Sequence, residues 1–330
     1  MAIPARFNAF RIHDDAPGHR SGIEEAALGE LLDGEVAIRA AHSSVNYKDA
    51  LAGSGTGRIL RRFPLIGGID VAGHVAASRA SAFREGDAVL VTGCGLSETR
   101  DGGYARYVRA PADAVVALPD GLSLRDSMIL GTAGFTAALA LLRMEANRQT
   151  PSQGPLAVTG ATGGVGSLAI DIFDRAGYEV HAISGKAEQA DYLRSIGARE
   201  VLGRDALHAP RPLETPRFGG GLDNAGGPML VGLLAQTVFY GNVVSAGLAA
   251  STALDATVMP FILRGVSLLG VTAANAPRDL RDAVWQRLAD DWRPRHLQTI
   301  CTREIGLTEL PDAFARMLAG GSLGRTLVTL

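Results

Sequence analysis

The glycines Gly160, Gly163 and Gly166 constrain this chain more than any other feature of its sequence. They follow an apolar strand candidate at 155–159 and open a helix candidate at 166–176. In a strand–turn–helix unit, glycines at this spacing let backbone N–H groups approach a pyrophosphate, which rests on the helix N-terminus. Glycine alone is weak support, because 41 of the 330 residues are glycine. The strand before and the helix after make the turn a strong prediction of dinucleotide binding.

Strands and helices alternate after this turn. A helix is expected at 188–196, and short apolar runs predict further strands at 179–183, 200–202, 221–224, 241–246 and 267–271. Strands alternating with helices imply a parallel sheet with right-handed crossovers. The prediction is an α/β fold that contains a doubly wound Rossmann domain.

The first third of the chain has a different pattern. Short alternating strands are expected there at 34–41, 69–77 and 87–92. They predict a mostly β, barrel-like domain, which a helix at 311–318 and a strand at 325–330 are expected to rejoin. The predicted organisation is 1–123 for the first part of the β domain, 124–265 for the dinucleotide-binding domain and 266–330 for the return.

Bulk composition excludes several kinds of partner. Hydrophobic residues make up 47% and charged residues 20%, and the formal net charge is -2 with acids and bases mixed along the chain. This balance predicts no nucleic-acid partner and no membrane-attracting face. No apolar run approaches the roughly 20 residues that cross a bilayer. With two cysteines and no apolar secretion signal, we expect a cytoplasmic protein that acts on a small molecule.

The end of the second expected strand bears on which dinucleotide binds. An NAD site usually offers an acidic residue about 20 residues beyond the turn, for the ribose 2′-OH. Here the strand ends in Ser184, Gly185 and Lys186, and the first acid is Glu188. A hydroxyl and an ammonium suit a 2′-phosphate, and Arg204 can add a second positive charge. NADPH is therefore favoured over NADH, although Lys186 could also be a solvated lysine at a helix start.

Residues that other dehydrogenase classes need are missing. Zinc alcohol dehydrogenases have an early Cys or His ligand and then a Gly-His-Glu run, where this chain has Ser44–Tyr47 and Gly68–Asp70. Two cysteines cannot build a four-cysteine zinc lobe, and the seven histidines show no ligand spacing. No tyrosine has a lysine four residues later, as a Tyr-Lys general acid requires. We expect no metal, and direct hydride transfer to an activated C=C bond.

Motifs along nearly the whole chain carry a family resemblance. They include SSVNYKDAL, FPLIGGIDVAG, VTGATGGVGS, SAGLA, TVMPFILRGVSLLGV and GRTLV. The chain resembles the zinc-free medium-chain dehydrogenases/reductases named acryloyl-CoA reductase (NADPH), which were earlier named quinone oxidoreductases. The resemblance implies a GroES-like catalytic domain, an NADP-binding Rossmann domain and reduction of acryloyl-CoA to propanoyl-CoA. It also implies a homodimer formed through the edge of the cofactor-domain sheet.

The resemblance further implies roles for individual residues. The pyrophosphate would be held by Thr162, Gly163, Gly164 and Val165. The 2′-phosphate would be held by Ser184, Gly185, Lys186 and Arg204. The nicotinamide pocket would be lined by Leu248 and Ile262 and approached by Tyr47. The candidate catalytic residues, which would polarise the thioester carbonyl or deliver the proton, are Asn46 and Tyr47.

Two segments depart from the family pattern. Residues 97–103 lack an Asn-His-Trp-Gly-like run, and 272–275 replace an Asp-Ser pair. Both segments are expected to border the acyl pocket. The substrate therefore stays open between an acyl-CoA and a quinone or enone. A third interpretation is a sensor protein that binds NADPH without turnover.

Two groups of charged residues have more than one interpretation. Arg58, Arg61 and Arg62 could bind CoA phosphates or form a solvated basic turn. Asp70 could pair with Lys48 as a buried ion pair, with a structural rather than a catalytic role.

Overall fold

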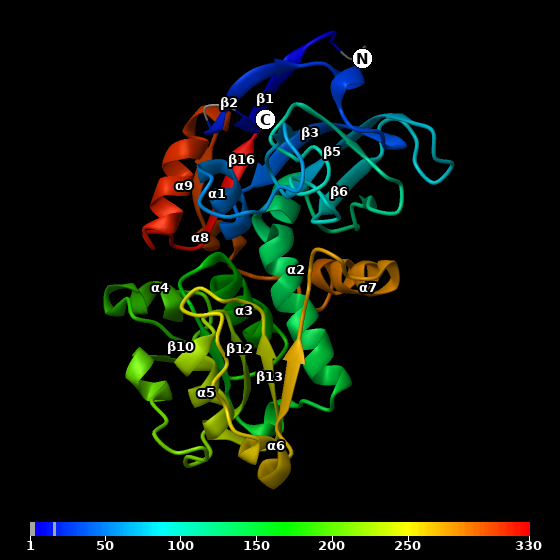
Figure 1. Ribbon diagram of the computed structural model, residues 1–330. Helices are drawn as coiled ribbons and strands as arrows, with labels where there is room; N and C mark the ends of the chain where they lie inside the picture. Colours follow the sequence, from blue (N-terminus) through cyan, green and yellow to red (C-terminus); the bar gives the residue numbers. More distant parts are fainter. Residues whose placement is uncertain (1–3, 16–17) are drawn as a thin grey trace. The chain divides into compact units, whose positions relative to one another are not determined.

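The computed structural model describes residues 4–15 and 18–330, and their contacts divide the chain into two compact units (Figure 1). Unit 1 contains the described residues up to Thr132 together with 273–282 and 301–330. Unit 2 contains 133–272 and 283–300. The first boundary therefore lies after Thr132 and not after residue 123.

The return to unit 1 is shorter than the expected 266–330. The strand at 267–270 pairs within the parallel sheet of unit 2. Trp285 packs on Phe135 of the same unit, with ring centroids 6.1 Å apart. Residues 283–300 therefore belong to unit 2. Local sequence patterns do not predict that these segments belong to unit 2, because they do not say which sheet a strand joins.

Unit 1 contains two sheets, as the mostly β prediction implies. A three-stranded sheet has the order β2-β1-β4, and a seven-stranded sheet has the order β15-β16-β3-β5-β6-β8 with β7 paired to β3. The strands are β1 (Phe7–Asp15), β2 (Gly18–Ala26), β3 (Val36–Ser44), β4 (Leu65–Ile66), β5 (Asp70–Ser78), β6 (Ala88–Thr92), β7 (Tyr107–Ala110), β8 (Val116–Ala117), β15 (Cys301–Ile305) and β16 (Arg325–Thr329). β16 pairs antiparallel with β3, which confirms the expected return of the chain end. Sequence patterns do not predict β2, because it is exposed along most of its length.

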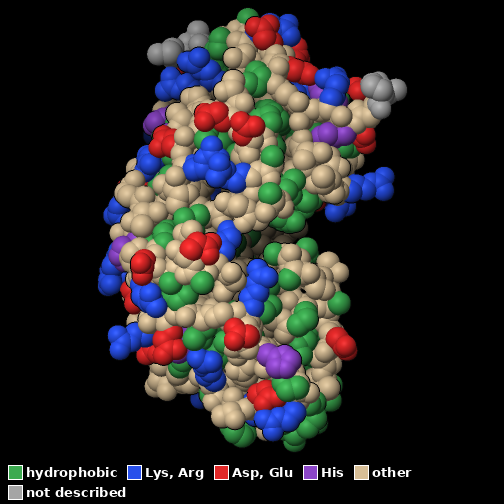
Figure 2. Space-filling view, turned by 90° about the vertical axis from the view of Figure 1, so that its left-hand side faces the viewer, with side chains coloured by type: hydrophobic (Ala, Val, Ile, Leu, Met, Phe, Trp, Pro, Cys, Tyr) green, Lys and Arg blue, Asp and Glu red, His purple; other side chains and the backbone are tan. Residues whose placement is uncertain are grey.

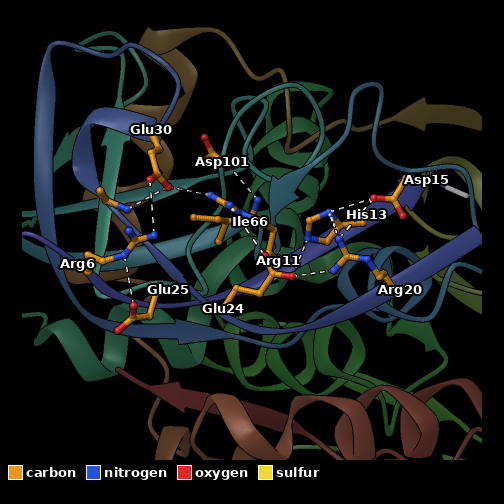
Figure 3. Close-up of polar contacts among 11 residues, drawn as sticks. Arg6, Arg11, His13, Asp15, Arg20, Glu24, Glu25, Glu30, Ile66 and Asp101 are labelled. Carbon is orange, nitrogen blue, oxygen red and sulfur yellow. Dashed lines mark hydrogen bonds and ion pairs between the residues drawn. The ribbon is translucent and has the colours of Figure 1, made fainter.

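Charged side chains line the β1–β2 hairpin (Figure 3). Arg20 Nη1 donates to Glu24 Oε1 over 2.8 Å, an exposed pair of a kind that contributes little to stability. In the same view, Asp101 Oδ1 accepts the Ile66 N–H over 3.1 Å and ties the 97–103 segment to β4. Charges of both signs are also interspersed over the face in Figure 2, in keeping with the formal net charge of -2.

Helix α1 (Tyr47–Ser54) packs against α9 (Leu310–Leu318). A Cβ at Gly53 would overlap the ring of Phe314, so this close approach requires glycine. Asn46 precedes α1 as its N-cap, in an extended conformation. These contacts fix the backbone at the start of α1, where two of the predicted site residues lie.

Unit 2 contains the predicted doubly wound sheet. Its order is β11-β10-β9-β12-β13-β14, and each neighbouring pair is parallel. The strands are β9 (Leu156–Thr159), β10 (Val180–Ile183), β11 (Glu200–Leu202), β12 (Phe218–Asp223), β13 (Thr237–Ser245) and β14 (Ser267–Gly270). This is the Rossmann order 3-2-1-4-5-6, whose ligand crevice lies at the carboxyl ends of the strands where the order reverses. That switch point is between β9 and β12.

Helices alternate with the strands of unit 2 (Figure 1). They are α3 (Gly164–Arg175), α4 (Ala190–Ser195), α5 (Gly227–Gln236), α6 (Met259–Arg264) and α8 (Leu297–Ile300), and α7 (Arg278–Ala289) starts in unit 1 and ends in unit 2. α3 buries Leu168, Ile172 and Phe173, as its spacing predicts. In Figure 1, α6 lies at the end of the sheet from which the strand arrows start.

Helix α2 (Leu124–Ala146) joins two helices across a break at Gly131, whose φ is 50°. A Cβ at Gly131 would lie 2.6 Å from Asp70 Oδ2, so this approach also requires glycine. By length and composition alone, α2 could cross a membrane, which corrects the expectation that no segment comes close. Its apolar window is 78% buried inside the protein, as in a core helix, so it carries no membrane assignment.

Candidate active site

The glycine turn joins β9 to α3 at the carboxyl edge of the parallel sheet. Gly160 has a φ of 59°, which favours glycine. A Cβ at Gly166 would overlap the Gly160 carbonyl and lie 2.7 Å from Ala161 Cα. α3 begins at Gly164, earlier than the expected residue 166. The N–H groups of the first helical turn have no intrahelical acceptor, and the helix dipole adds positive charge there. Thr162–Val165 therefore frame a site that suits a pyrophosphate.

A second positive corner lies where β10 and β11 end. The Ser184 N–H donates to Leu202 O over 2.9 Å and joins the two strand ends. Gly185 faces the Arg204 guanidinium so closely that a Cβ there would lie 2.7 Å from Arg204 Nε. The Lys186 N–H donates to Ser184 Oγ over 3.0 Å. Within the part of the chain that the structure describes, Arg204 has no hydrogen-bond or ion-pair partner for its side chain. The four residues predicted to hold a 2′-phosphate therefore lie together.

Hydrogen bonds join the carboxyl ends of β9 and β12. Sequence patterns do not predict these contacts. Thr159 Oγ1 donates to Asp223 Oδ1 over 2.7 Å, and Asn224 Nδ2 donates to Thr159 O over 2.8 Å. The loop after β13 is tied to the same edge, because the Gly247 N–H donates to Asp223 O over 3.2 Å. Leu248 follows in this loop and is 59% exposed. Leu248 thus lies at the same edge of the sheet as the glycine turn.

Ile262 does not lie at this edge. It belongs to α6, which precedes β14, and Arg264 at the end of α6 donates to Ala235 O over 2.9 Å, just before β13 begins. In a parallel sheet, residues that precede a strand lie at the opposite edge from residues that follow one. Ile262 is 71% exposed at that amino edge. Within one chain, Ile262 therefore lies at the opposite edge of the sheet from Leu248 and the glycine turn, and its place at a nicotinamide pocket stays a prediction.

Asn46 is buried directly before α1, with 9% of its surface exposed. Its Nδ2 donates to Asp70 Oδ2 over 2.8 Å and to Asp49 Oδ2 over 3.1 Å. Its Oδ1 accepts from Arg325 Nη1 over 3.1 Å. Both sides of the carboxamide are thus engaged within unit 1, which suits a residue that positions its neighbours.

Asp70 does not pair with Lys48, contrary to the prediction. Its carboxylate accepts from Ser44 Oγ over 2.7 Å and from Thr132 Oγ1 over 2.6 Å. Lys48 instead donates to Glu98 Oε2 over 2.5 Å, and this bond holds the pKa of Glu98 below its usual range. The reason is that Asp70 is completely buried, whereas the Lys48 side chain is one-third exposed.

Asp49 is the second buried carboxylate beside Asn46. It accepts from the backbone N–H groups of Asn46 and Ile69, each over 2.9 Å. Burial, followed by the negative charge of Asp70, raises the pKa of Asp49 to about 7. Burial also lowers the pKa of the Arg325 guanidinium. Two carboxylates and one guanidinium thus form a polar network inside unit 1, which fixes the position of its members.

The residues at the zinc positions of alcohol dehydrogenases do not suit a metal ion. The Arg325 guanidinium donates to Ser44 Oγ over 2.7 Å, so a fixed positive charge lies among these donors and would repel a divalent cation. Among residues 4–15 and 18–330, no group of three or more His, Cys, Asp and Glu side chains could hold a metal ion.

Tyr47 is the first residue of α1, and its side chain is more exposed than that of Asn46. It is 48% exposed, and its hydroxyl has no hydrogen-bond partner among the described residues. The backbone that carries it is fixed by the Asn46 contacts. Tyr47 therefore presents a phenol that can donate to a ligand.

The two segments that depart from the family pattern are anchored by local contacts. In the first, Glu98 Oε1 accepts from Arg61 Nε over 3.2 Å, besides its bond to Lys48. In the second, Ala274 O accepts the Cys94 N–H over 3.0 Å. Both contacts lie within unit 1.

Two family models match the chain in the order of its two units. The family described as "Alcohol dehydrogenase GroES-like domain" matches residues 32–120, and the family described as "Zinc-binding dehydrogenase" matches residues 164–290. Together with the fold, these matches show that the chain is an oxidoreductase of the medium-chain dehydrogenase/reductase family.

Relatives and solved structures place the chain more closely within this family. The chain is 42% identical to "Putative quinone oxidoreductase YhfP" of Bacillus subtilis, over 100% of this chain and 98% of that protein. It is 40% identical to "Acrylyl-CoA reductase AcuI" of Ruegeria pomeroyi, over 98% of each. The crystal structure of yhdH from Salmonella enterica in complex with NADP has a TM-score of 0.94 at 40% identity, with coverage of 98% and 99%. That of Bacillus subtilis yhfP with NAD bound has a TM-score of 0.96 at 41% identity, with coverage of 99% and 100%. The chain thus belongs to the group within the family that contains these proteins.

Proposed function

We propose that this protein reduces the C=C bond of a 2-enoyl thioester with NADPH, and that its substrate is acryloyl-CoA, which becomes propanoyl-CoA. The observation that carries the choice of cofactor is the Arg204 guanidinium against Gly185, beside Ser184 and Lys186. This corner offers positive charge and a hydroxyl where an NAD site offers an acid. The name of the Ruegeria pomeroyi relative supports the thioester.

In this proposal the phosphates and the nicotinamide of the cofactor have defined partners in unit 2. NADPH, when bound, supplies a hydride to the β-carbon of the substrate. Thr162–Val165 hold its pyrophosphate at the start of α3. Ser184, Lys186 and Arg204 hold its 2′-phosphate, and Leu248 lines the nicotinamide pocket.

We assign the chemistry of unit 1 to Tyr47. Its phenol stabilises the negative charge that develops on the thioester oxygen, or delivers the proton to the α-carbon. Asn46 is a positioning residue, because its carboxamide is occupied by Asp49, Asp70 and Arg325. We further propose that no metal takes part, since Arg325 places a fixed cation among the donors at the zinc positions.

A quinone or enone reductase is the second candidate, supported by the name of the Bacillus subtilis relative. The same hydride geometry serves both substrates, so the fold does not separate them. The remaining alternative, a sensor that binds NADPH without turnover, differs from both in having no reaction.

One assay separates these functions. NADPH consumption is measured in parallel with acryloyl-CoA, crotonyl-CoA and a simple quinone. We expect the highest kcat/KM with acryloyl-CoA. Turnover of the quinone alone would refute the thioester proposal. No turnover of any of the three, together with NADPH binding measured by fluorescence, would instead favour the sensor.

We also propose that the protein is a cytoplasmic homodimer paired through β14. β14 is the last strand in the sheet order, and large exposed apolar side chains lie near its start, namely Phe239, Tyr240, Val258, Ile262 and Leu263. Two edge strands related by a twofold axis would run antiparallel. The start of one β14 would then lie near the end of the other, so Ile262 would reach the nicotinamide pocket of the second copy.

A further inference from the structure

A cavity of about 690 Å³ lies beside α1 in unit 1. Its lining combines the hairpin end, α1, the segment after α1 and the 97–103 loop, and includes His19, Lys48, Arg58, Arg61, Phe63 and Glu98. This cavity is named the α1 pocket. Small-molecule sites typically have volumes of roughly 300–1,000 Å³, so the α1 pocket is large enough for a ligand.

Positive charge exceeds negative charge in the α1 pocket. Lys48 and Arg61 both bond to Glu98, at 2.5 and 3.2 Å, so one carboxylate is shared by two cations. Among the described residues that line the pocket, the other carboxylate is Asp14. Arg58 is exposed and has no hydrogen-bond or ion-pair partner in the described part of the chain. A guanidinium held at a pocket wall without a carboxylate partner suits a phosphate.

Two neighbours of Arg58 add to this chemistry. Arg62 is exposed and also has no partner for its side chain among residues 4–15 and 18–330. Phe63 lines the pocket and is 41% exposed, so it offers an aromatic face. Nucleobases stack on such faces, and guanidinium groups bind the attached phosphates. The combination therefore suits a phosphorylated nucleotide better than an inorganic anion.

The part of the α1 pocket that contains Arg58 lies at the opposite end of α1 from Tyr47. Tyr47 begins α1, whereas Gly55–Arg58, which line the pocket, directly follow its last turn. Eight residues of α-helix span about 12 Å at 1.5 Å per residue. In a CoA thioester the pantetheine arm separates the acyl group from the nucleotide, so the two ends need sites at a distance.

We infer that the α1 pocket binds the 3′-phosphorylated ADP portion of a CoA thioester whose acyl group lies near Tyr47. Arg58, with Arg62, pairs with the phosphates, and Phe63 stacks on the adenine. Lys48 and Arg61 remain tied to Glu98 and contribute long-range attraction. The identity of the ligand as an acyl-CoA rests on the proposed function, whereas the basic pocket itself does not.

Calorimetric titration with CoA itself tests this site. The titration is run with NADP⁺ at saturation, so that the coenzyme site is already filled. Arg58→Ala should raise the Kd for CoA about tenfold, as expected for one lost charge-assisted hydrogen bond, and Arg58→Glu should raise it further. The matched control is Arg84→Ala, an exposed arginine of unit 1 outside the pocket, which should leave the Kd unchanged. Equal Kd values for the wild type and both Arg58 variants would overturn the inference.

A second measurement separates this inference from the proposed reaction. KM is compared for acryloyl-CoA and for acryloyl-pantetheine, which lacks the nucleotide. Arg58→Ala together with Arg62→Ala should raise KM for acryloyl-CoA about tenfold or more and leave KM for acryloyl-pantetheine within twofold. An equal rise for both thioesters would overturn the nucleotide site. If neither thioester is turned over, the proposed reaction fails, and the CoA titration alone still decides whether the pocket binds the nucleotide.

Discussion

Arg325 Nη1 donates to Asn46 Oδ1 over 3.1 Å and so ties the last strand of the chain to the N-cap of α1. The same guanidinium donates from Nε to Ile129 O over 2.9 Å and from Nη1 to Val45 O over 3.0 Å. Arg325 is 3% exposed, and its charge is balanced by the buried carboxylates beside it. Tyr47 directly follows Asn46, so its position depends on a strand contributed by the far end of the chain.

Replacing Arg325 by methionine should destabilise unit 1. The substitution keeps much of the side-chain volume but removes the donor to four acceptor oxygens and the positive charge near two buried carboxylates, a loss that typically costs about 3–5 kcal/mol. Urea unfolding followed by circular dichroism measures the change. Arg316→Met, at an exposed position on α9, is the matched control and should stay within about 0.5 kcal/mol of the wild type. A loss below 1 kcal/mol for Arg325→Met, on the scale of an exposed pair, would show that the network does not hold α1.

Tyr47→Phe should separate the chemical role of the phenol from packing. Loss of a hydrogen-bond donor to developing negative charge lowers kcat by about 10²-fold or more. Because the Tyr47 side chain is half-exposed, the unfolding midpoint should not move. Steady-state kinetics with acryloyl-CoA give the rate. A kcat within twofold of the wild type would exclude the phenol from the reaction.

Asp49 should make stability depend on pH in an unusual direction. Its pKa of about 7 exceeds the ordinary 3.8, so between these values the native state binds more protons than the unfolded state. This stabilising contribution is complete below about pH 4 and is lost as the pH rises through about 7. The free energy of unfolding, measured for the wild type minus Asp49→Asn, should fall with pH by up to about 1.4 kcal/mol per unit. A flat difference for Asp49→Asn would contradict the raised pKa.

The cofactor-binding half could be predicted from sequence because its signals are local. The turn at Gly160–Gly166 and the corner at Ser184–Lys186 each occupy a short window directly after a strand. Strand ends of a parallel sheet meet at one edge, so local order is enough to bring such windows together. Ile262 is the exception. It precedes β14 and therefore lies at the amino edge of the sheet, although the residue follows a strand in the sequence.

The network in unit 1 could not be predicted in this way. Arg325 and Asn46 are 279 positions apart, and neither local pattern indicates the other. Asp70 shows the same difficulty, since its partners Ser44 and Thr132 lie on separate elements. The prediction that Asp70 pairs with Lys48 rested on their opposite charges. The burial of Asp70 instead determines which side chains bond to it.

Arg204→Ala and Lys186→Ala should each change cofactor preference. Loss of one charged contact to the 2′-phosphate should raise KM for NADPH roughly tenfold or more and leave KM for NADH nearly unchanged. Paired assays with both cofactors measure this. Arg199→Ala, an exposed arginine just before β11, is the control and should affect neither. An equal effect on both cofactors would refute a 2′-phosphate role for these side chains.

Ile262→Asp should convert a dimer into monomers. A charge placed among the exposed apolar residues of α6 would be desolvated in an interface between two β14 edges, and an unpaired buried charge is costly. Light scattering after gel filtration gives the mass, and Ile23→Asp, an exposed isoleucine on β2, controls for the substitution itself. Ile262→Ala should keep the dimer and raise KM for NADPH, because only a second copy would bring this side chain to a carboxyl edge. A monomeric wild type would refute the proposed dimer, and an Ile262→Asp variant that stays dimeric would place the interface on another surface.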